Sequence, residues 1–141
     1  MKKILIISAN YYSEITSKLE DKAKNYLKAN NFKVSLVKVP GVFEIPISLR
    51  KNIKNFDGFV AVGCVIKGST PHFDFICKSS FDAILKISIM YNKPIGNGII
   101  TALNKKQALE RCGKIKSTKP NKGLEAAKAV MSILKNGPKK I

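Results

Sequence analysis

The chain has few of the residues that build metal centres and disulfide scaffolds. Its 141 residues include one histidine, three cysteines and no tryptophan. The cysteines, Cys64, Cys77 and Cys112, are far apart and odd in number, and no Cys-x-x-Cys pair occurs. Structural metal sites need several Cys or His ligands at close spacing, so the sequence predicts neither a metal centre nor a disulfide scaffold. We expect three reduced thiols that are mostly buried.

Long apolar runs are also missing. No run approaches the roughly 18 residues that span a bilayer. The apolar start of the chain stops after Ala9 and has no clear small-residue cleavage site. We therefore expect a cytoplasmic protein without a membrane segment. With 45% apolar and 25% charged residues, a chain of this length is expected to form one globular domain, residues 1–141.

Acidic residues are scarce. Nine Asp and Glu face 26 Lys and Arg, which gives a formal net charge of +17. This charge raises the hypothesis of a module that binds RNA or another polyanion. However, only Arg50 and Arg111 are arginines, and base reading favours arginine. The lysines are also scattered along the chain, so we favour a solvated basic surface with no specific nucleic-acid partner and an attraction for anionic substrates.

Strand and helix patterns alternate along the chain. Short apolar runs predict strands over residues 3–9, 33–39, 58–66 and 94–101. Helical spacing and caps predict helices over residues 14–30, 43–54, 73–92, 105–112 and 122–135, with Ser13 capping the first and Asn104 the fourth. This order predicts an α/β three-layer sandwich, with a four-stranded parallel sheet of flavodoxin-like order 2-1-3-4 and helices on both faces. Ligands of such folds bind beyond the carboxyl ends of the strands.

The stretch from Gly63 to Phe75 carries the clearest functional signal. A buried strand ends here, a Lys-Gly-Ser-Thr-Pro loop follows, and the single histidine, His72, stands at the start of a helix. Loop N–H groups and the positive end of a helix bind anions, and histidine moves protons near neutral pH. The segment therefore predicts chemistry on a phosphate-bearing substrate. Dinucleotide and P-loop glycine signatures are absent.

Four segments resemble lumazine synthase, the penultimate enzyme of riboflavin synthesis. In chain order they are residues 40–46, 63–75, 107–111 and 121–127, so the resemblance spans nearly the whole chain. It implies a transferase that condenses 5-amino-6-(D-ribitylamino)uracil with 3,4-dihydroxy-2-butanone 4-phosphate and releases phosphate and water. It also implies that no cofactor or metal is needed. The archaeal-type riboflavin synthase, which shares the architecture, is the alternative enzyme.

The resemblance also implies a role for each matching residue. His72 falls on the histidine that transfers protons, and Arg111 falls on the arginine that binds phosphate together with the loop of Ser69 and Thr70. The pocket for the pyrimidine and its ribityl chain is matched by Tyr11, Val42, Phe43, Glu44, Cys64, Val65, Ile66, Asn97 and Lys122.

Some of these residues have structural explanations as well, and three positions depart from the family pattern: Tyr11, Tyr12, which stands where Asn is common, and Asn97. Helix-start chemistry alone would make Phe43 a core residue and Glu44 a partner of the helix dipole. Tyr11 stands where Phe or Trp is common in the family, which keeps an aromatic face for stacking. Asn97 stands where an aromatic residue is common, so that wall of the pocket is expected to rely on backbone contacts.

The resemblance further implies a homo-oligomer whose sites are shared between neighbouring subunits, and riboflavin synthase as an associated enzyme. Family members form pentamers or cages of sixty subunits. The linker of residues 114–120 is longer than is usual in cage formers, and the chain starts directly at its first strand. Because high like charge also opposes close packing of many copies, we expect a pentamer, closed by heterologous contacts.

Overall fold

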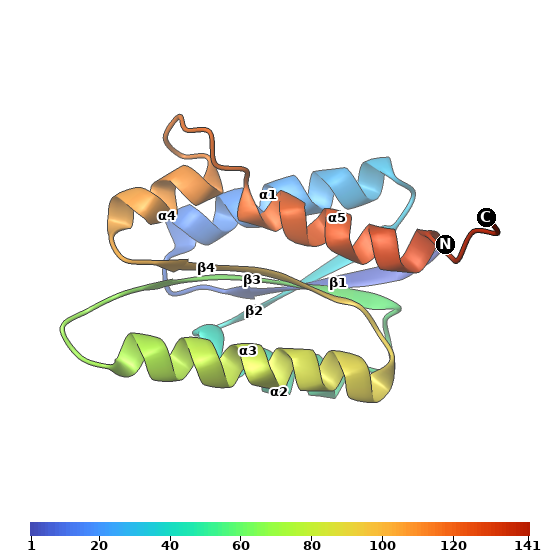
Figure 1. Cartoon of the computed structure of the whole chain (residues 1–141), viewed down its shortest axis with the longest axis horizontal. Coiled ribbons are helices and arrows are strands. Elements are labelled where there is room, and N and C mark those ends of the chain that lie inside the picture. The colour runs from blue at the N-terminus through green and yellow to red at the C-terminus, as the bar shows by residue number, and fades with distance from the viewer.

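The chain folds into three layers around a parallel sheet. The structure, a computed structural model, describes residues 1–141. The strands are β1 (Lys3–Ala9), β2 (Lys33–Val39), β3 (Gly58–Ile66) and β4 (Ile95–Ala102), in the order β2-β1-β3-β4. Helices α1 (Ser13–Ala29), α4 (Lys105–Cys112) and α5 (Lys122–Lys135) cover one face, and α2 (Ile45–Asn52) and α3 (His72–Tyr91) cover the other (Figure 1). The predicted three-layer sandwich and its strand order are confirmed.

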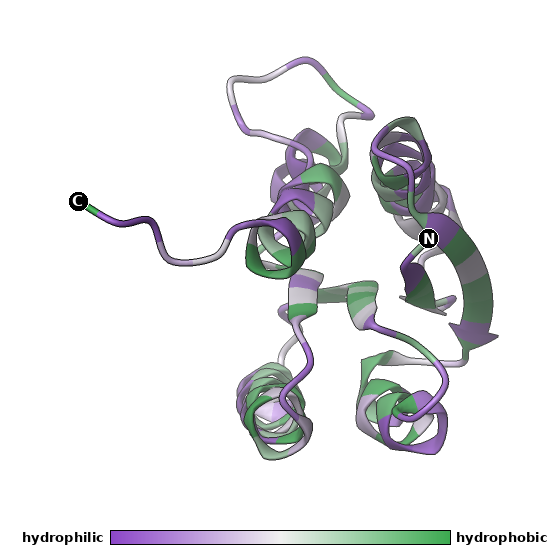
Figure 2. Cartoon of the chain, turned by 90° about the vertical axis from the view of Figure 1, so that its right-hand side faces the viewer, coloured by the Kyte–Doolittle hydropathy of each residue, from purple (hydrophilic) through white to green (hydrophobic).

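The two central strands, β1 and β3, hold the core together because they are buried on both faces. Alternate side chains of a strand point to opposite faces. Ile4 and Ile6 of β1 therefore join the apolar cluster beneath α1, α4 and α5, while Leu5 and Ile7 join the cluster beneath α2 and α3. Seen along the strands, the sheet separates the two helical layers (Figure 2). Such double burial explains why both strands are near-continuous apolar runs.

One polar pair lies within this core. The Ser8 hydroxyl at the carboxyl end of β1 donates a hydrogen bond to the Glu20 carboxylate of α1, and both side chains are buried. A buried polar group without a partner is costly. This hydrogen bond therefore gives both polar side chains a partner inside the apolar contact between α1 and the sheet.

The predicted helix starts are partly wrong. Ser13 does not cap α1: it is the first helical residue, and Tyr12 occupies the cap position without a side-chain hydrogen bond. The helix predicted over residues 43–54 is divided into a 3-10 turn, η1 (Val42–Glu44), and the shorter α2. Pro46 explains this division, because its ring fits the first turn of an α-helix but supplies no N–H to a continuous helix before it.

The predicted limits of α3 are each one residue off, whereas the α4 cap is confirmed. His72 is the first residue of α3, and Asn92 follows the helix in a left-handed conformation with φ of 52°. The Asn104 side chain accepts a hydrogen bond from the Gln107 N–H at 2.9 Å, as the sequence predicts. Gly113 ends α4 with φ of 79°, a conformation that suits glycine.

Two glycines let α5 approach its neighbours at backbone distance. A Cβ on Gly96 of β4 would collide with the Ala126 carbonyl of α5. A Cβ on Gly123 of α5 would collide with the backbone carbonyl of Leu19 in α1. These contacts involve backbone rather than flexible side chains, so they fix α5 against both the sheet and α1.

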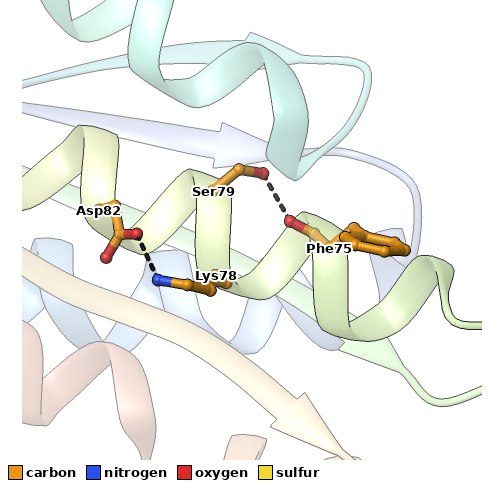
Figure 3. Close-up of polar contacts among 4 residues, drawn as sticks. All are labelled: Phe75, Lys78, Ser79 and Asp82. Atoms are coloured by element: carbon orange, nitrogen blue, oxygen red, sulfur yellow. Dashed lines mark hydrogen bonds and ion pairs between the residues drawn. The ribbon is translucent and has the colours of Figure 1, made fainter.

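Helix α3 is apolar, yet half of its residues are exposed. Of its 20 residues only Ser80 and Ile84 are buried. Its outer surface holds intrahelical contacts: the Ser79 hydroxyl donates to the Phe75 carbonyl at 2.6 Å, and the Lys78 ammonium lies 2.9 Å from the Asp82 carboxylate (Figure 3). The large apolar side chains exposed on this helix are Phe75, Leu85, Ile89 and Met90. No helix combines the length and apolarity needed to cross a membrane.

The excess of lysine is left largely without ionic partners. Only three ion pairs form, joining Lys24 with Asp21, Lys78 with Asp82, and Lys105 with Glu14. All three lie on the surface, where such pairs contribute about 0–1 kcal/mol. Stability therefore comes from the apolar core rather than from its charges.

The close contact of α5 with α1 predicts a position-specific effect of adding one methyl group. We expect Gly123→Ala to lower the free energy of unfolding by about 1–3 kcal/mol, because the new Cβ overpacks against the Leu19 carbonyl. Urea unfolding followed by circular dichroism measures this change. Gly137→Ala is the matched control, since no atom lies within 4 Å of its Cβ position. Equal stability of the two variants would contradict the packing argument.

Candidate active site

One cavity lies at the carboxyl ends of β1 and β3, between η1 and the start of α3. Its volume is about 530 Å³. The predicted site residues that line it are Tyr11, Val42, Phe43, Glu44, Cys64, Val65, Ile66, Thr70 and His72. Ser69 belongs to the same loop but does not line the cavity. The parallel sheet explains this gathering, because the loops that follow its strands meet at one edge.

The end of β3 gives the cavity an open backbone edge. The pairing of β3 with β1 stops at Val62, opposite Ser8, whereas its pairing with β4 continues to Ile66, opposite Ala102. Residues 63–66 therefore have no strand beside them on the β1 side. Peptide N–H and C=O groups on that side are free to bind a planar ligand with donors and acceptors along its edge.

Aromatic faces stand at the mouth of the cavity. Tyr11 is 76% exposed and Phe43 is 65% exposed, high values for such large apolar side chains. Tyr12, which packs edge-on against Tyr11 at 4.8 Å between ring centres, also lines the cavity, as do Phe73 and Ile76 of α3. Burial raises the pKa of the Tyr12 hydroxyl, with smaller contributions from Tyr11, Cys64 and Glu14. These exposed rings offer stacking surfaces for a heterocycle.

His72 is held at the rim by the first turn of α3. Its backbone N–H lies 3.5 Å from the Thr70 hydroxyl, and the Asp74 N–H donates to the Pro71 carbonyl at 3.1 Å. Asp74 in this first turn complements the positive end of the helix. The imidazole is exposed, so it can reach a ligand that enters the cavity from solvent.

The other predicted residues lie in a second cavity, along the outer edge of β4. This cavity has a volume of about 290 Å³ and is lined by Asn97 of β4, Arg111 of α4 and Lys122 of α5. It shares no lining residue with the cavity of His72. One chain therefore does not bring Arg111 and His72 together, although the resemblance gives both a role with the same substrate.

Hydrogen bonds within the chain orient two of these side chains. One Arg111 guanidinium nitrogen donates to the Gln107 carbonyl at 3.0 Å, which leaves further donors of the planar group free. The Asn97 side-chain oxygen accepts from the Ile99 N–H at 3.0 Å, so it is bound to its own strand. Lys119, Glu125 and Phe81, which the sequence did not single out, also line this cavity.

The cysteines are free thiols in protected surroundings, and no three His, Cys, Asp or Glu side chains converge as metal ligands would. Cys64 and Cys112 are buried, and Cys77 is half-buried. Burial, with smaller contributions from Cys112 and Glu14, raises the pKa of the Cys64 thiol to about 12. Burial and the nearby Asp74 also raise the pKa of Cys77.

These thiol environments predict the order of chemical labelling. The thiolate is the reactive form, so a raised pKa keeps Cys64 protonated and unreactive at pH 8. We expect an aromatic disulfide reagent to label Cys77 first in the native protein, more slowly than free cysteine, and all three thiols after denaturation. Cys77→Ser is expected to abolish the native-state labelling. Rapid labelling of Cys64 in native Cys77→Ser protein would contradict the description of its surroundings.

Comparison with known proteins shows the family of the chain. Residues 1–136 match the family model of 6,7-dimethyl-8-ribityllumazine synthase. The chain is 40% identical over 134 residues to the 6,7-dimethyl-8-ribityllumazine synthase of Bdellovibrio bacteriovorus, a match that covers 94% of this chain and 73% of that protein. The same enzyme of Campylobacter jejuni is 40% identical over 137 residues, covering 94% and 87%. That of Campylobacter curvus is 38% identical over 138 residues, covering 94% and 86%. The chain therefore belongs to the 6,7-dimethyl-8-ribityllumazine synthase family, transferases of riboflavin biosynthesis, as its four sequence segments indicate.

Proposed function

We propose that the chain condenses 5-amino-6-(D-ribitylamino)uracil with 3,4-dihydroxy-2-butanone 4-phosphate to give 6,7-dimethyl-8-ribityllumazine. The observation that carries this proposal is the cavity at the end of β3, which combines exposed aromatic rings, an open strand edge and His72. Family membership supports the same reaction. Phosphate and water are the other products.

The pyrimidine would bind between the aromatic faces and the open strand edge. Tyr11 and Phe43 supply flat apolar surfaces against which a ring can stack. The free peptide groups of residues 63–66 meet the carbonyl and N–H groups along the ring edge. Glu44 lines the same cavity and its carboxylate can accept hydrogen bonds from the ribityl hydroxyls.

His72 would move the protons of the condensation. The pyrimidine amine attacks the substrate ketone, and the carbinol oxygen must gain a proton to leave as water and form an imine. A proton is then lost from the neighbouring carbon, and the C–O bond to phosphate breaks with its electron pair leaving on phosphate. The resulting enol gains a proton at its terminal carbon and becomes a ketone. The ribitylamino nitrogen attacks that carbonyl carbon and closes the ring with loss of a second water. Histidine suits this sequence because it accepts and donates protons near neutral pH.

Phosphate recognition would require a second copy of the chain. Arg111 and Lys122 supply cations suited to phosphate, but their cavity is separate from that of His72 on the same chain. A ring in which the β4 edge of one copy meets the His72 cavity of the next would unite them, with Ser69 and Thr70 on the facing loop. The exposed apolar residues of α3 support association, and we propose a pentamer.

A spectrophotometric assay with both substrates tests the reaction. We expect the native chain to form lumazine. In His72→Ala we expect turnover to fall by up to about 10²-fold, the lower end of the contribution that a general acid–base group makes to a reaction rate. Lys78→Ala is the control, since Lys78 lies on the same helix and outside the cavity. Unchanged turnover in folded His72→Ala would remove His72 from the mechanism. Conversion of lumazine alone to riboflavin would instead favour the riboflavin synthase alternative.

Mixing two impaired variants tests the proposed shared site. His72→Ala and Arg111→Ala damage different cavities, so a mixed ring would contain some interfaces that join an intact His72 to an intact Arg111. Random mixing in equal amounts is expected to restore about a quarter of the sites in a ring of heterologous contacts. The variants are dissociated, mixed and reassembled before the assay. The double variant reassembled with itself is the control, and failure of the mixture to exceed both parents would contradict a site built from two copies.

A further inference from the structure

The linker between α4 and α5 contributes a third cation to the cavity along β4. Arg111, Lys119 and Lys122 all line this cavity of about 290 Å³, and Glu125 is the one acidic residue beside them. None of the three cations belongs to an ion pair. Their excess positive charge is therefore available to an anion that enters the cavity.

Hydrogen bonds hold this linker in a defined shape. The Asn121 side chain donates to the Cys112 carbonyl at 2.9 Å and so joins the end of α4 to the start of α5. The Ser117 hydroxyl donates to the Glu110 carbonyl at 3.4 Å and accepts from the Lys119 N–H at 3.0 Å. Pro120 then restricts the backbone between Lys119 and α5. Lys119, which lines the cavity, is thus held at its backbone by its own segment.

The position of Lys119 separates it from the other lysines of the linker. Lys114 and Lys116 are exposed and do not line the cavity. If the linker were only a solvated basic segment, nothing would distinguish the position of one of its three lysines from that of the other two. Of these three linker lysines only Lys119 shares the cavity with Arg111, the residue to which the resemblance assigns phosphate binding.

We propose that Lys119 is a phosphate-binding residue that acts together with Arg111 on the four-carbon sugar phosphate. This inference rests on the proposed function. A guanidinium binds two phosphate oxygens with its planar fork, and an ammonium meets a remaining oxygen as a compact charge. Because Lys119 is exposed at the cavity mouth, solvent screens it, and its contribution is smaller than that of a buried cation.

Steady-state kinetics of Lys119→Met measures this contribution. The variant keeps a long side chain and removes the charge. At low salt we expect the KM for the sugar phosphate to rise by about three- to fivefold, the size of an exposed charge contact. The KM for the pyrimidine and kcat are expected to stay unchanged, and Lys119→Arg to restore most of the affinity. The difference in this KM between the native protein and Lys119→Met should shrink as the salt concentration rises.

Lys116→Met is the matched control, because it removes an equal charge from the same linker outside the cavity. An equal rise in KM for both variants would show that the positive charge of the linker attracts the substrate at long range, without a direct contact between Lys119 and phosphate. This result would overturn the proposal. An unchanged KM in Lys119→Met would overturn it too.

Titration calorimetry with inorganic phosphate, without the pyrimidine, separates this inference from the proposed function. Weaker phosphate binding by Lys119→Met than by Lys116→Met supports Lys119 as a phosphate ligand. If the two variants differ in this way but the native protein forms no lumazine, the proposed reaction fails and the assignment of Lys119 as a phosphate ligand stands. If it forms lumazine while both variants bind phosphate as the native chain does, the inference about Lys119 fails alone.

Discussion

The burial of β1 and β3 on both faces determines where every other element lies. Fully burying an isoleucine or valine contributes about 1.5–3 kcal/mol, and these two strands supply such side chains to both apolar clusters. A parallel sheet covered on both faces needs a helix between successive strands, with right-handed crossovers. The segments at the carboxyl ends of β1, β2 and β3 consequently meet at one edge, which brings Tyr11, Phe43 and Ile66 to the same cavity although they are far apart in the chain.

The elements whose formation depends on local pattern could be predicted from the sequence. β1 and β3 follow from uninterrupted apolar runs, and the α4 cap follows from the Asn104 side chain and a nearby Gln107. The start of α1 could not be predicted in this way. Ser13 has the side chain of a typical cap, but it is the first residue of the helix, and Tyr12 holds the cap position. The 3-10 turn before Pro46 has no periodic signal either, since it is only three residues long.

The sequence and the resemblance name candidate residues for the site but do not divide them between the two cavities. The loop before His72 and the resemblance indicated most of the lining of its cavity. The separation of Arg111 from His72 depends on β4 being an outer strand, so that α4 and α5 face a different edge of the molecule. Lys119 was missed for a related reason: in a chain with 26 basic residues, a lysine in a polar linker has no signature of its own. Only the fold shows which of them borders a cavity.

The shortage of ion pairs has a consequence for assembly. Only three ion pairs form in a chain whose net charge is +17, so dissolved anions balance most of its positive charge. When such chains associate, their positive surfaces approach and the local demand for anions grows. By linkage, association then takes up anions from solution, and whatever anion binds the assembled form more strongly stabilises it. A multivalent anion does this more effectively than chloride. Phosphate, a product of the proposed reaction, would thus also act as a counterion that favours the proposed pentamer.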